Sequence, residues 1–226
     1  MNSFRGQTDK KIFNSRNRSL TYSQKSIFEF YERKLSIESF LNIKNMNNYK
    51  KKILEIGFGT GKTILESARS NPESLYVGIE YYKKGIAQLL IGIKRNNLKN
   101  IRLFYGNAEN FIKISDKNLF DEILIMFPDP WPKKKHWKRR FIQKDNVRNL
   151  KRVLRNRGKI YFFTDDQNLA IWGLRTFLEE NLIWAAKKPS DCKINTFDYS
   201  ESKYEKKAKK EKKKPYYFKF NKIEMN

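Results

Sequence analysis

From residue 51 onward, runs of apolar residues alternate with longer stretches whose apolar positions have helical spacing. This alternation is typical of βαβ units, in which helices connect the parallel strands of one sheet. The pattern therefore predicts an α/β fold with a mostly parallel sheet and helices on both faces. Strands are expected at 52–56, 75–80, 101–105, 121–127, 159–164 and 216–222, and helices at 61–70, 82–97, 142–154 and 167–181.

The length of the chain favours one main domain with short additions. A chain of 226 residues that is 39% hydrophobic can bury one sizeable core, which we place at 51–226. Residues 1–50 are interpreted as a basic N-terminal arm and a leading helix, because apolar positions within 26–41 have helical spacing. Residues 201–214 are mostly lysine and glutamate, so we expect this lysine-rich segment to be mobile.

The formal net charge of +25 indicates a polyanionic partner, and nucleic acid is the first expectation. The alternative is that the lysines are simply spread over a solvated surface. A single cysteine, Cys192, and no apolar run of 18 residues predict a cytoplasmic protein of a reducing compartment, without a membrane partner. One histidine and one cysteine are too few for a metal cluster. The basic N-terminus is expected to be a flexible arm, with an organelle transit peptide as the alternative.

A glycine-rich stretch, "LEIGFGTG", follows the first expected strand and opens a helix. Gly57, Gly59 and Gly61 would let the backbone approach a ligand at the N-terminus of that helix. A P-loop would require a glycine at the position of Ile56. A dinucleotide fingerprint would require G-x-G-x-x-G, whereas the spacing here is G-x-G-x-G.

Acidic residues near these glycines favour S-adenosylmethionine as the ligand. Glu55 precedes Gly57 by two residues, where it would repel a pyrophosphate but attract the ammonium and sulfonium groups of S-adenosylmethionine. Glu80 ends the second expected strand, where a carboxylate can accept hydrogen bonds from ribose hydroxyls. Asn107 follows the third strand and is placed to read the adenine. The alternatives are a strand-end charge for Glu55, a solvated turn residue for Glu80 and a helix N-cap for Asn107.

The stretch "FPDPWPKKKHWKRR" at residues 127–140 follows the fourth expected strand. Its three prolines stiffen the loop and hold Asp129 at the carboxyl edge of the sheet, where such folds bind ligands. The alternative is that Asp129 only caps a turn. Six cations in 133–140, with Trp137 among them, form a basic patch suited to phosphates and an unstacked base. A solvated run of charge is the alternative.

These motifs, together with "VGIE", "FTD" and "SKYE", resemble the bacterial tRNA (guanine-N7-)-methyltransferase family over about residues 50–220. The resemblance implies a Rossmann-like class I methyltransferase fold with a mostly parallel seven-stranded sheet. It also implies S-adenosylmethionine as methyl donor and N7 of guanine 46, in the tRNA variable loop, as acceptor. Implied cofactor contacts are Glu55, Glu80, Asn107 and Asp129; implied tRNA contacts are Lys133, Lys135, His136, Trp137, Lys138, Arg139, Arg140, Asp165, Ser202, Lys203, Tyr204 and Glu205.

The chain departs from the family pattern at two positions. Asn107 stands where the family has aspartate, and Ser202 stands where the family has threonine. Both replacements keep a hydrogen-bonding oxygen, so we expect altered affinity and not lost activity.

The chemistry expected of Asp129 follows from the acceptor atom. Guanine N7 already has an in-plane lone pair, so no base has to remove a proton, and the methylated purine is positively charged. A carboxylate beside the ring stabilises that charge as it develops. Asp165 is expected to orient the base, with a helix cap as the alternative. Two other functions stay open, a methyltransferase for another RNA base or a protein, and a non-catalytic RNA-binding module. The sequence also leaves monomer and homodimer open.

Overall fold

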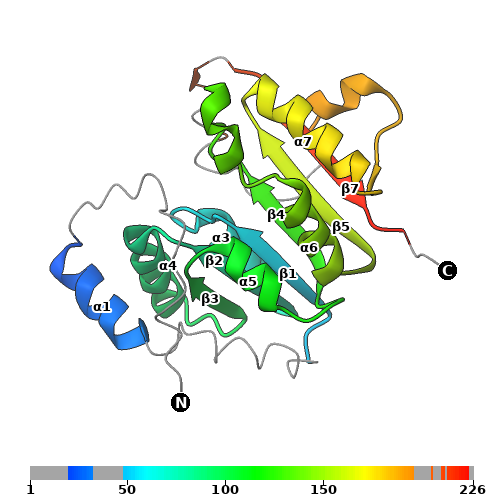
Figure 1. Cartoon of the computed structure of the whole chain (residues 1–226). Coiled ribbons are helices and arrows are strands. Elements are labelled where there is room, and N and C mark those ends of the chain that lie inside the picture. The colour runs from blue at the N-terminus through cyan, green and yellow to red at the C-terminus, as the bar shows by residue number, and fades with distance from the viewer. Residues whose placement is uncertain (1–19, 33–47, 196–204, 206–209, 212, 224–226) are drawn as a thin grey trace.

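The computed structural model describes residues 20–32, 48–195, 205, 210–211 and 213–223. Within these residues, seven strands form one sheet in the order β3-β2-β1-β4-β5-β7-β6. Strands β1 to β5 are parallel, and β7 runs antiparallel to both β5 and β6, which confirms the predicted Rossmann-like sheet (Figure 1). The strands are β1 (Lys51–Ile56), β2 (Ser74–Glu80), β3 (Ile101–Tyr105), β4 (Phe120–Met126), β5 (Leu154–Thr164), β6 (Ile183–Trp184) and β7 (Tyr216–Asn221).

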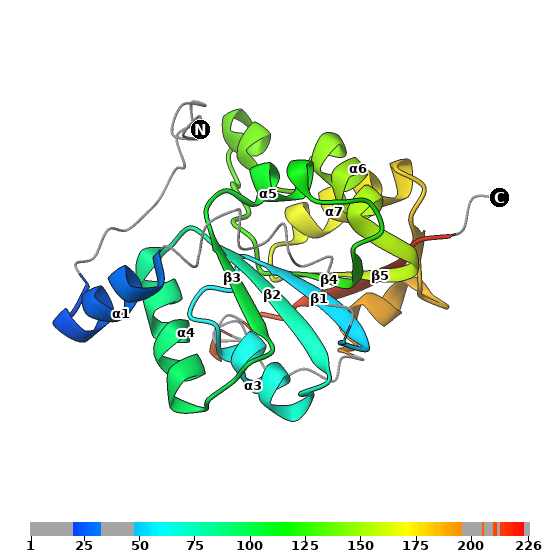
Figure 2. The same cartoon turned by 90° about the horizontal axis from the view of Figure 1, so that it is seen from below.

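Helices cover both faces of the sheet (Figure 2). One face carries α1 (Tyr22–Glu32), α3 (Lys62–Ser70) and α4 (Lys83–Arg95). The other carries α5 (Ala108–Ile114), α6 (Lys144–Val153) and α7 (Gln167–Glu179). The described residues also contain two short 3-10 helices, η4 (Lys134–Arg139) and η5 (Pro189–Lys193). No helix of the described residues is long and apolar enough to cross a bilayer.

Two hydrophobic cores lie on the two sides of the sheet, because successive strand residues point to opposite faces. Ile53 belongs to the core beneath α3 and α4, whereas the next residue, Leu54, belongs to the core beneath α5 to α7. In β4, Ile123, Leu124 and Ile125 are all at most 1% exposed. This continuously apolar strand therefore lies inside a sheet that helices cover on both faces, where strands of this composition are expected.

Three elements differ from the expectation. Helix α5 was missed because it has only seven residues, and the Asn107 side chain caps it by accepting the N–H of Glu109 at 2.7 Å. Strand β5 begins at Leu154, which pairs with Phe120, so the strand starts five residues before the expected 159. The resemblance implied a seventh strand without giving its position; this strand is β6, which has only two residues.

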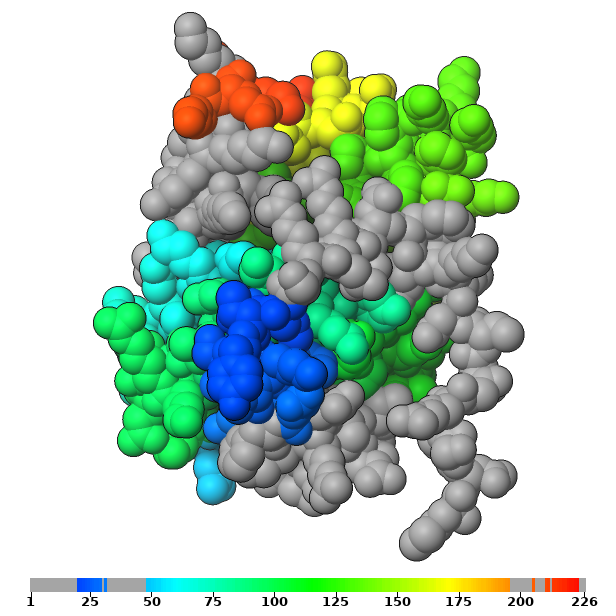
Figure 3. Space-filling view, turned by 90° about the vertical axis from the view of Figure 1, so that its left-hand side faces the viewer, coloured from blue at the N-terminus to red at the C-terminus, as the bar shows by residue number. Residues whose placement is uncertain are grey.

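The leading helix α1 begins earlier than expected. Thr21 and Gln24 exchange hydrogen bonds of 3.1 and 3.3 Å in a capping box that starts the helix. Phe28 is buried, and Figure 3 shows α1 in blue lying against the body of the protein beside α4. Residues 33–41 of the expected helix, and most of 201–214, lie outside the described residues.

Candidate active site and RNA-binding surface

The glycine loop joins β1 to α3 at the carboxyl edge of the sheet. Gly57, Gly59 and Gly61 have φ values of 71°, 60° and 73°, in the left-handed region that favours glycine. The Gly57 N–H donates to the carbonyl of Ile79 at 2.8 Å, which ties the loop to the neighbouring strand β2. The loop therefore follows β1, as the sequence predicted, and is held against the end of β2; its binding of a ligand stays a prediction.

Gly85 completes the glycine loop, although the sequence analysis did not single it out. A Cβ atom at this position in α4 would lie 1.9 Å from the carbonyl oxygen of Gly59. The helix can approach the loop so closely only because residue 85 has no side chain. A glycine inside an expected helix, where glycine is unfavourable, was the available signal.

Glu80 is fixed at the end of β2 by three backbone N–H groups. Its carboxylate accepts hydrogen bonds from Gly59 and Tyr81 at 2.7 Å and from Tyr82 at 3.0 Å. Burial raises the pKa of Glu80, while these three donors oppose that rise. A carboxylate has about four lone-pair sites. Glu80 can therefore hold the glycine loop and still accept a hydrogen bond from a ligand hydroxyl.

Glu55 is a buried acid in β1, only 4% exposed. Burial, and to a smaller degree the nearby charge of Glu80, raises the pKa of Glu55 to about 8. The side chain is therefore mostly protonated at neutral pH in the ligand-free protein. A cationic ligand placed against Glu55 would favour its ionised form.

We predict that Glu55→Gln changes the pH dependence of stability. The pKa of Glu55 is about 8 in the folded protein and 4.5 as its ordinary value. Between these two pH values the folded state keeps a proton that the unfolded state has lost. The free energy of unfolding of the wild type therefore falls progressively as the pH rises from 4.5 to 8. Without ligand, the free energy of unfolding of Glu55→Gln minus that of wild type should be larger at pH 9 than at pH 5, by about 2 to 4 kcal/mol. Urea unfolding at both pH values measures this difference; a difference that stays constant with pH would mean that Glu55 is ionised throughout.

An aromatic cluster lies beside this edge, where β2 and β3 end. The rings of Tyr81 and Tyr105 stack at 5.7 Å, and Phe28 of α1 meets Tyr105 edge-on at 5.4 Å. Lys83 lies 5.5 Å from the ring centre of Phe28. Asn107 follows β3 at the same edge and acts as the N-cap of α5, which was the alternative interpretation of this residue.

Asp129 lies on the proline-rich loop after β4. The flanking residues Phe127 and Trp131 have φ values of 51° and 43°, which are uncommon for bulky side chains. Asp129 lines a pocket of about 290 Å³ with Pro130, Trp131, Pro132, Lys133 and His136. Desolvation by the surrounding atoms raises the pKa of Asp129, although the residue is exposed. Its charge also contributes to the raised pKa of Glu80, which places both acids at one edge.

The basic run forms the short helix η4 beside this pocket. Lys133, Lys135 and Lys138 are exposed, as a phosphate-binding surface requires. Partial burial, followed by the charges of Arg139, Lys135 and Lys133, lowers the pKa of His136. Trp131, which the sequence analysis did not place in the site, packs edge-on against His136 at 5.7 Å. Arg139 lies 5.1 Å from the centre of the Trp131 ring.

Two of the expected tRNA contacts are buried. Arg140 is 1% exposed and Glu205 is 4% exposed, so neither side chain faces solvent. The Glu205 carboxylate instead accepts a hydrogen bond of 2.7 Å from the Tyr217 hydroxyl and one of 3.2 Å from Asn195. The bond from Tyr217 attaches Glu205 to β7. The other three expected contacts of that segment, at 202–204, lie outside the described residues.

Asp165 lies beside Lys213 of the lysine-rich segment. Its carboxylate forms an ion pair of 3.4 Å with Lys213. The N-cap of α7 is the next residue, Asp166, which accepts the N–H of Leu169 at 2.7 Å. Asp165 is therefore not the helix cap that the sequence analysis considered as its alternative. In the described part of the chain, no group of three metal-ligating side chains comes together.

The fold and this edge of acids and glycines define a class I methyltransferase. A family model described as putative methyltransferase matches residues 49–218. In solved structures, the 16S rRNA methyltransferase KamB superposes with a TM-score of 0.60 at 13% identity, covering 84% of this chain and 95% of that one. The aminoglycoside resistance methyltransferase NpmB1 superposes with a TM-score of 0.54 at 14% identity, over 84% and 94% of the two chains.

The chain belongs to the tRNA (guanine-N(7)-)-methyltransferase family. The relative of that name from Agrobacterium fabrum (strain C58 / ATCC 33970) is 35% identical over 168 residues, which are 74% of this chain and 72% of the relative. The relative from Rhodopseudomonas palustris (strain HaA2) is 34% identical over 168 residues, and the match spans 66% of its length. Helix α1 lies outside the residues that the family model matches.

Proposed function

We propose that the protein transfers a methyl group from S-adenosylmethionine to N7 of guanine 46 in the variable loop of tRNA. The observation that carries this proposal is one sheet edge that combines the glycine loop, held by Glu80, with Asp129 and an exposed basic helix. The names of the curated relatives support the same acceptor. The proposed acceptor position follows from the sequence resemblance.

The residues at the edge fit S-adenosylmethionine. Glu55 is a buried acid with a raised pKa, as expected where a cationic ligand supplies the missing charge. Glu80 is placed to accept hydrogen bonds from ribose hydroxyls, and Gly85 lets α4 pack directly on the Gly59 carbonyl of the glycine loop. The Asn107 oxygen caps α5, so its amide nitrogen is the group proposed to contact the adenine. When bound, S-adenosylmethionine supplies a methyl group on a sulfonium, a good leaving group.

Asp129 acts in this proposal as an electrostatic stabiliser and not as a base. The N7 lone pair forms the new bond to carbon while the bond from carbon to sulfur breaks, so the purine gains a positive charge and no proton moves. A carboxylate beside the ring favours that charge in the transition state. Asp165 is proposed to orient the guanine, which would require the Lys213 ion pair to open or share the carboxylate.

The exposed lysines of η4 and of the residue before it are proposed to contact tRNA phosphates. The triple substitution Lys133→Gln, Lys135→Gln and Lys138→Gln should weaken tRNA binding and reduce the slope of log affinity against log salt by about 2 to 3. Arg140 is left out because it is buried. Filter binding at several salt concentrations measures the slope.

A matched control removes three exposed lysines from the opposite edge of the sheet, Lys94, Lys99 and Lys117. This control has the same change in net charge but should leave the slope nearly unchanged. Equal effects of the two triple variants would show that tRNA responds to overall charge and not to the basic helix.

Mass spectrometry tests the proposed function directly. Purified protein is incubated with a tRNA transcript and S-adenosylmethionine labelled on the methyl group, and the digested RNA is searched for N7-methylguanosine. We expect one labelled guanine, in the variable loop, and none when position 46 is changed to adenine. Label on another RNA base or on a protein would instead establish a different acceptor, and binding of tRNA without any transfer would establish a binding module.

A further inference from the structure

The Asp129 loop has few backbone donors with which it can be anchored. Three of the five residues at 128–132 are prolines, which lack an N–H group. The loop must therefore be held mainly through its carbonyl oxygens, and these need donors from elsewhere. Arg140 supplies one, because its Nε donates to the Pro130 carbonyl at 2.9 Å. The Trp137 indole N–H lies 3.4 Å from the Pro132 carbonyl.

Arg140 is buried among aromatic rings directly behind this loop. Its guanidinium carbon lies 4.7 Å from the ring centre of Trp137 and 5.3 Å from that of Trp172. Burial lowers the pKa of Arg140, and the nearby charge of Asp166 opposes that change. Among the described residues, its Nη2 atom is buried without a hydrogen-bond partner. The side chain thus keeps a buried charge and an unsatisfied donor, both of which are costly.

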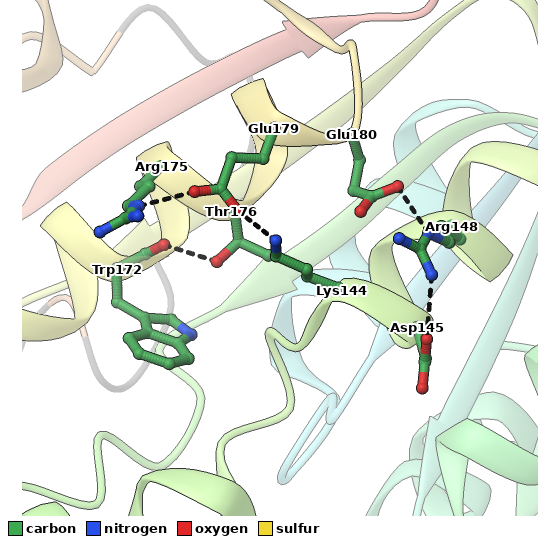
Figure 4. Close-up of polar contacts among 8 residues, drawn as sticks. All are labelled: Lys144, Asp145, Arg148, Trp172, Arg175, Thr176, Glu179 and Glu180. Carbon is green, nitrogen blue, oxygen red and sulfur yellow. Dashed lines mark hydrogen bonds and ion pairs between the residues drawn. The ribbon is translucent and has the colours of Figure 1, made fainter.

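The indole of Trp172, on which Arg140 packs, is itself held in place. Its N–H donates to the carbonyl of Ile142 at 2.6 Å. Ion pairs hold α7, which carries Trp172, against α6: Lys144 pairs with Glu179 at 2.8 Å and Arg148 pairs with Glu180 at 2.9 Å (Figure 4). Because Trp172 is held in place, the guanidinium that packs on it is held too, and its hydrogen bond can fix the Pro130 carbonyl.

We propose that Arg140 is a positioning residue that holds Asp129 in place through the Pro130 carbonyl, and that it does not bind tRNA phosphate. The inference rests on the proposed function of Asp129. An apolar side chain of similar size would fill the space between the indoles at no greater cost than a buried cation. What only a long side chain with a directed donor supplies here is the hydrogen bond to the residue that follows Asp129.

The test replaces Arg140 and measures single-turnover methyl transfer with tRNA and S-adenosylmethionine both saturating. Arg140→Met should slow transfer by about 10- to 100-fold, because small displacements of a catalytic group are costly. Its tRNA dissociation constant and salt slope should stay close to wild type. The matched control is Arg152→Met, since Arg152 also donates to carbonyls, those of Ser115 and Ile112, but at the opposite edge of the sheet. The control should transfer at the wild-type rate.

A double-mutant cycle distinguishes action through Asp129 from a general effect. In an Asp129→Asn background, Arg140→Met should slow transfer by less than about threefold. Full additivity, a wild-type rate for Arg140→Met, or a salt slope reduced by about 1 would each overturn the proposal. If Arg140→Met does not fold, Arg140→Lys takes its place, and failure of both to fold would make the residue structural. An unaffected Asp129→Asn rate would contradict the role proposed for Asp129 itself, whatever the rate of Arg140→Met.

Discussion

Asp129→Asn should slow single-turnover methyl transfer by about 10²- to 10³-fold, which corresponds to roughly 3 to 4 kcal/mol of transition-state stabilisation. The substitution keeps the size of the side chain and one acceptor oxygen, so it removes little except the charge. That charge matters because the purine becomes cationic as the methyl group arrives. Asp129 lines a pocket with His136 and Trp131, and we propose that the base enters there.

The rate must be measured with both ligands saturating, because the methyl donor is itself cationic and its affinity is expected to fall. The affinity for tRNA should stay within a few-fold of wild type, since the phosphate contacts are proposed to come from exposed lysines. Asp129→Ala should be no faster than Asp129→Asn. A near wild-type rate for the asparagine variant would leave Asp129 as a turn residue, and Asp165 would be the next candidate for the electrostatic role.

The regular alternation of apolar runs and stretches with helical spacing explains why so much of the fold was predictable from the sequence. The strands β1 to β5 are read from apolar runs, and their parallel pairing brings the segments that follow them to one edge. Glu55, Glu80 and Asp129 each lie at or after the end of a strand, so the sequence placed them on this edge. The raised pKa of Glu80, to which Asp129 contributes, agrees with that proximity.

Burial of single charged residues was not predictable in the same way. Arg140 belongs to a run of cations, and only the fold shows that Trp172, 32 residues further along the chain, encloses it. Glu205 likewise lies in a strongly charged segment, and its partner Tyr217 is in a strand that pairs with β5. Local sequence describes the neighbours along the chain, whereas the exposure of a side chain depends on neighbours in space.

Asn107 illustrates a third limit, because hydrogen bonding by its amide supports both interpretations of the residue, the adenine contact and the helix N-cap. Its amide oxygen caps α5, a helix too short for its periodicity to be recognised. Its amide nitrogen is still available to the proposed adenine contact. The two roles use different atoms, so the cap fixes the orientation of the amide that would read the base.

Gly85→Ala is expected to reduce the affinity for S-adenosylmethionine by about 100-fold or more, roughly 3 kcal/mol. The added Cβ would lie 1.9 Å from the Gly59 carbonyl oxygen and 2.9 Å from its carbon, so backbone must move. Displacing Gly59 also breaks the geometry of the 2.7 Å hydrogen bond from its N–H to Glu80. One added methyl group therefore disturbs the glycine loop together with Glu80, the carboxylate proposed to bind the ribose. Isothermal titration calorimetry measures the affinity. Urea unfolding should show that the free energy of unfolding falls by about 1 to 3 kcal/mol.

Gly92→Ala is the matched control, because Gly92 lies in the same helix α4 and is also closely packed. Its added Cβ would meet the Leu65 side chain at 2.8 Å, and a flexible leucine can move where a backbone carbonyl cannot. Both substitutions improve helix propensity by the same amount, so that contribution cancels in the comparison. Gly92→Ala should bind S-adenosylmethionine within about twofold of wild type. Equal losses in the two variants would place the effect in the stability of α4; a loss confined to Gly85→Ala would place it in the contact between α4 and the glycine loop.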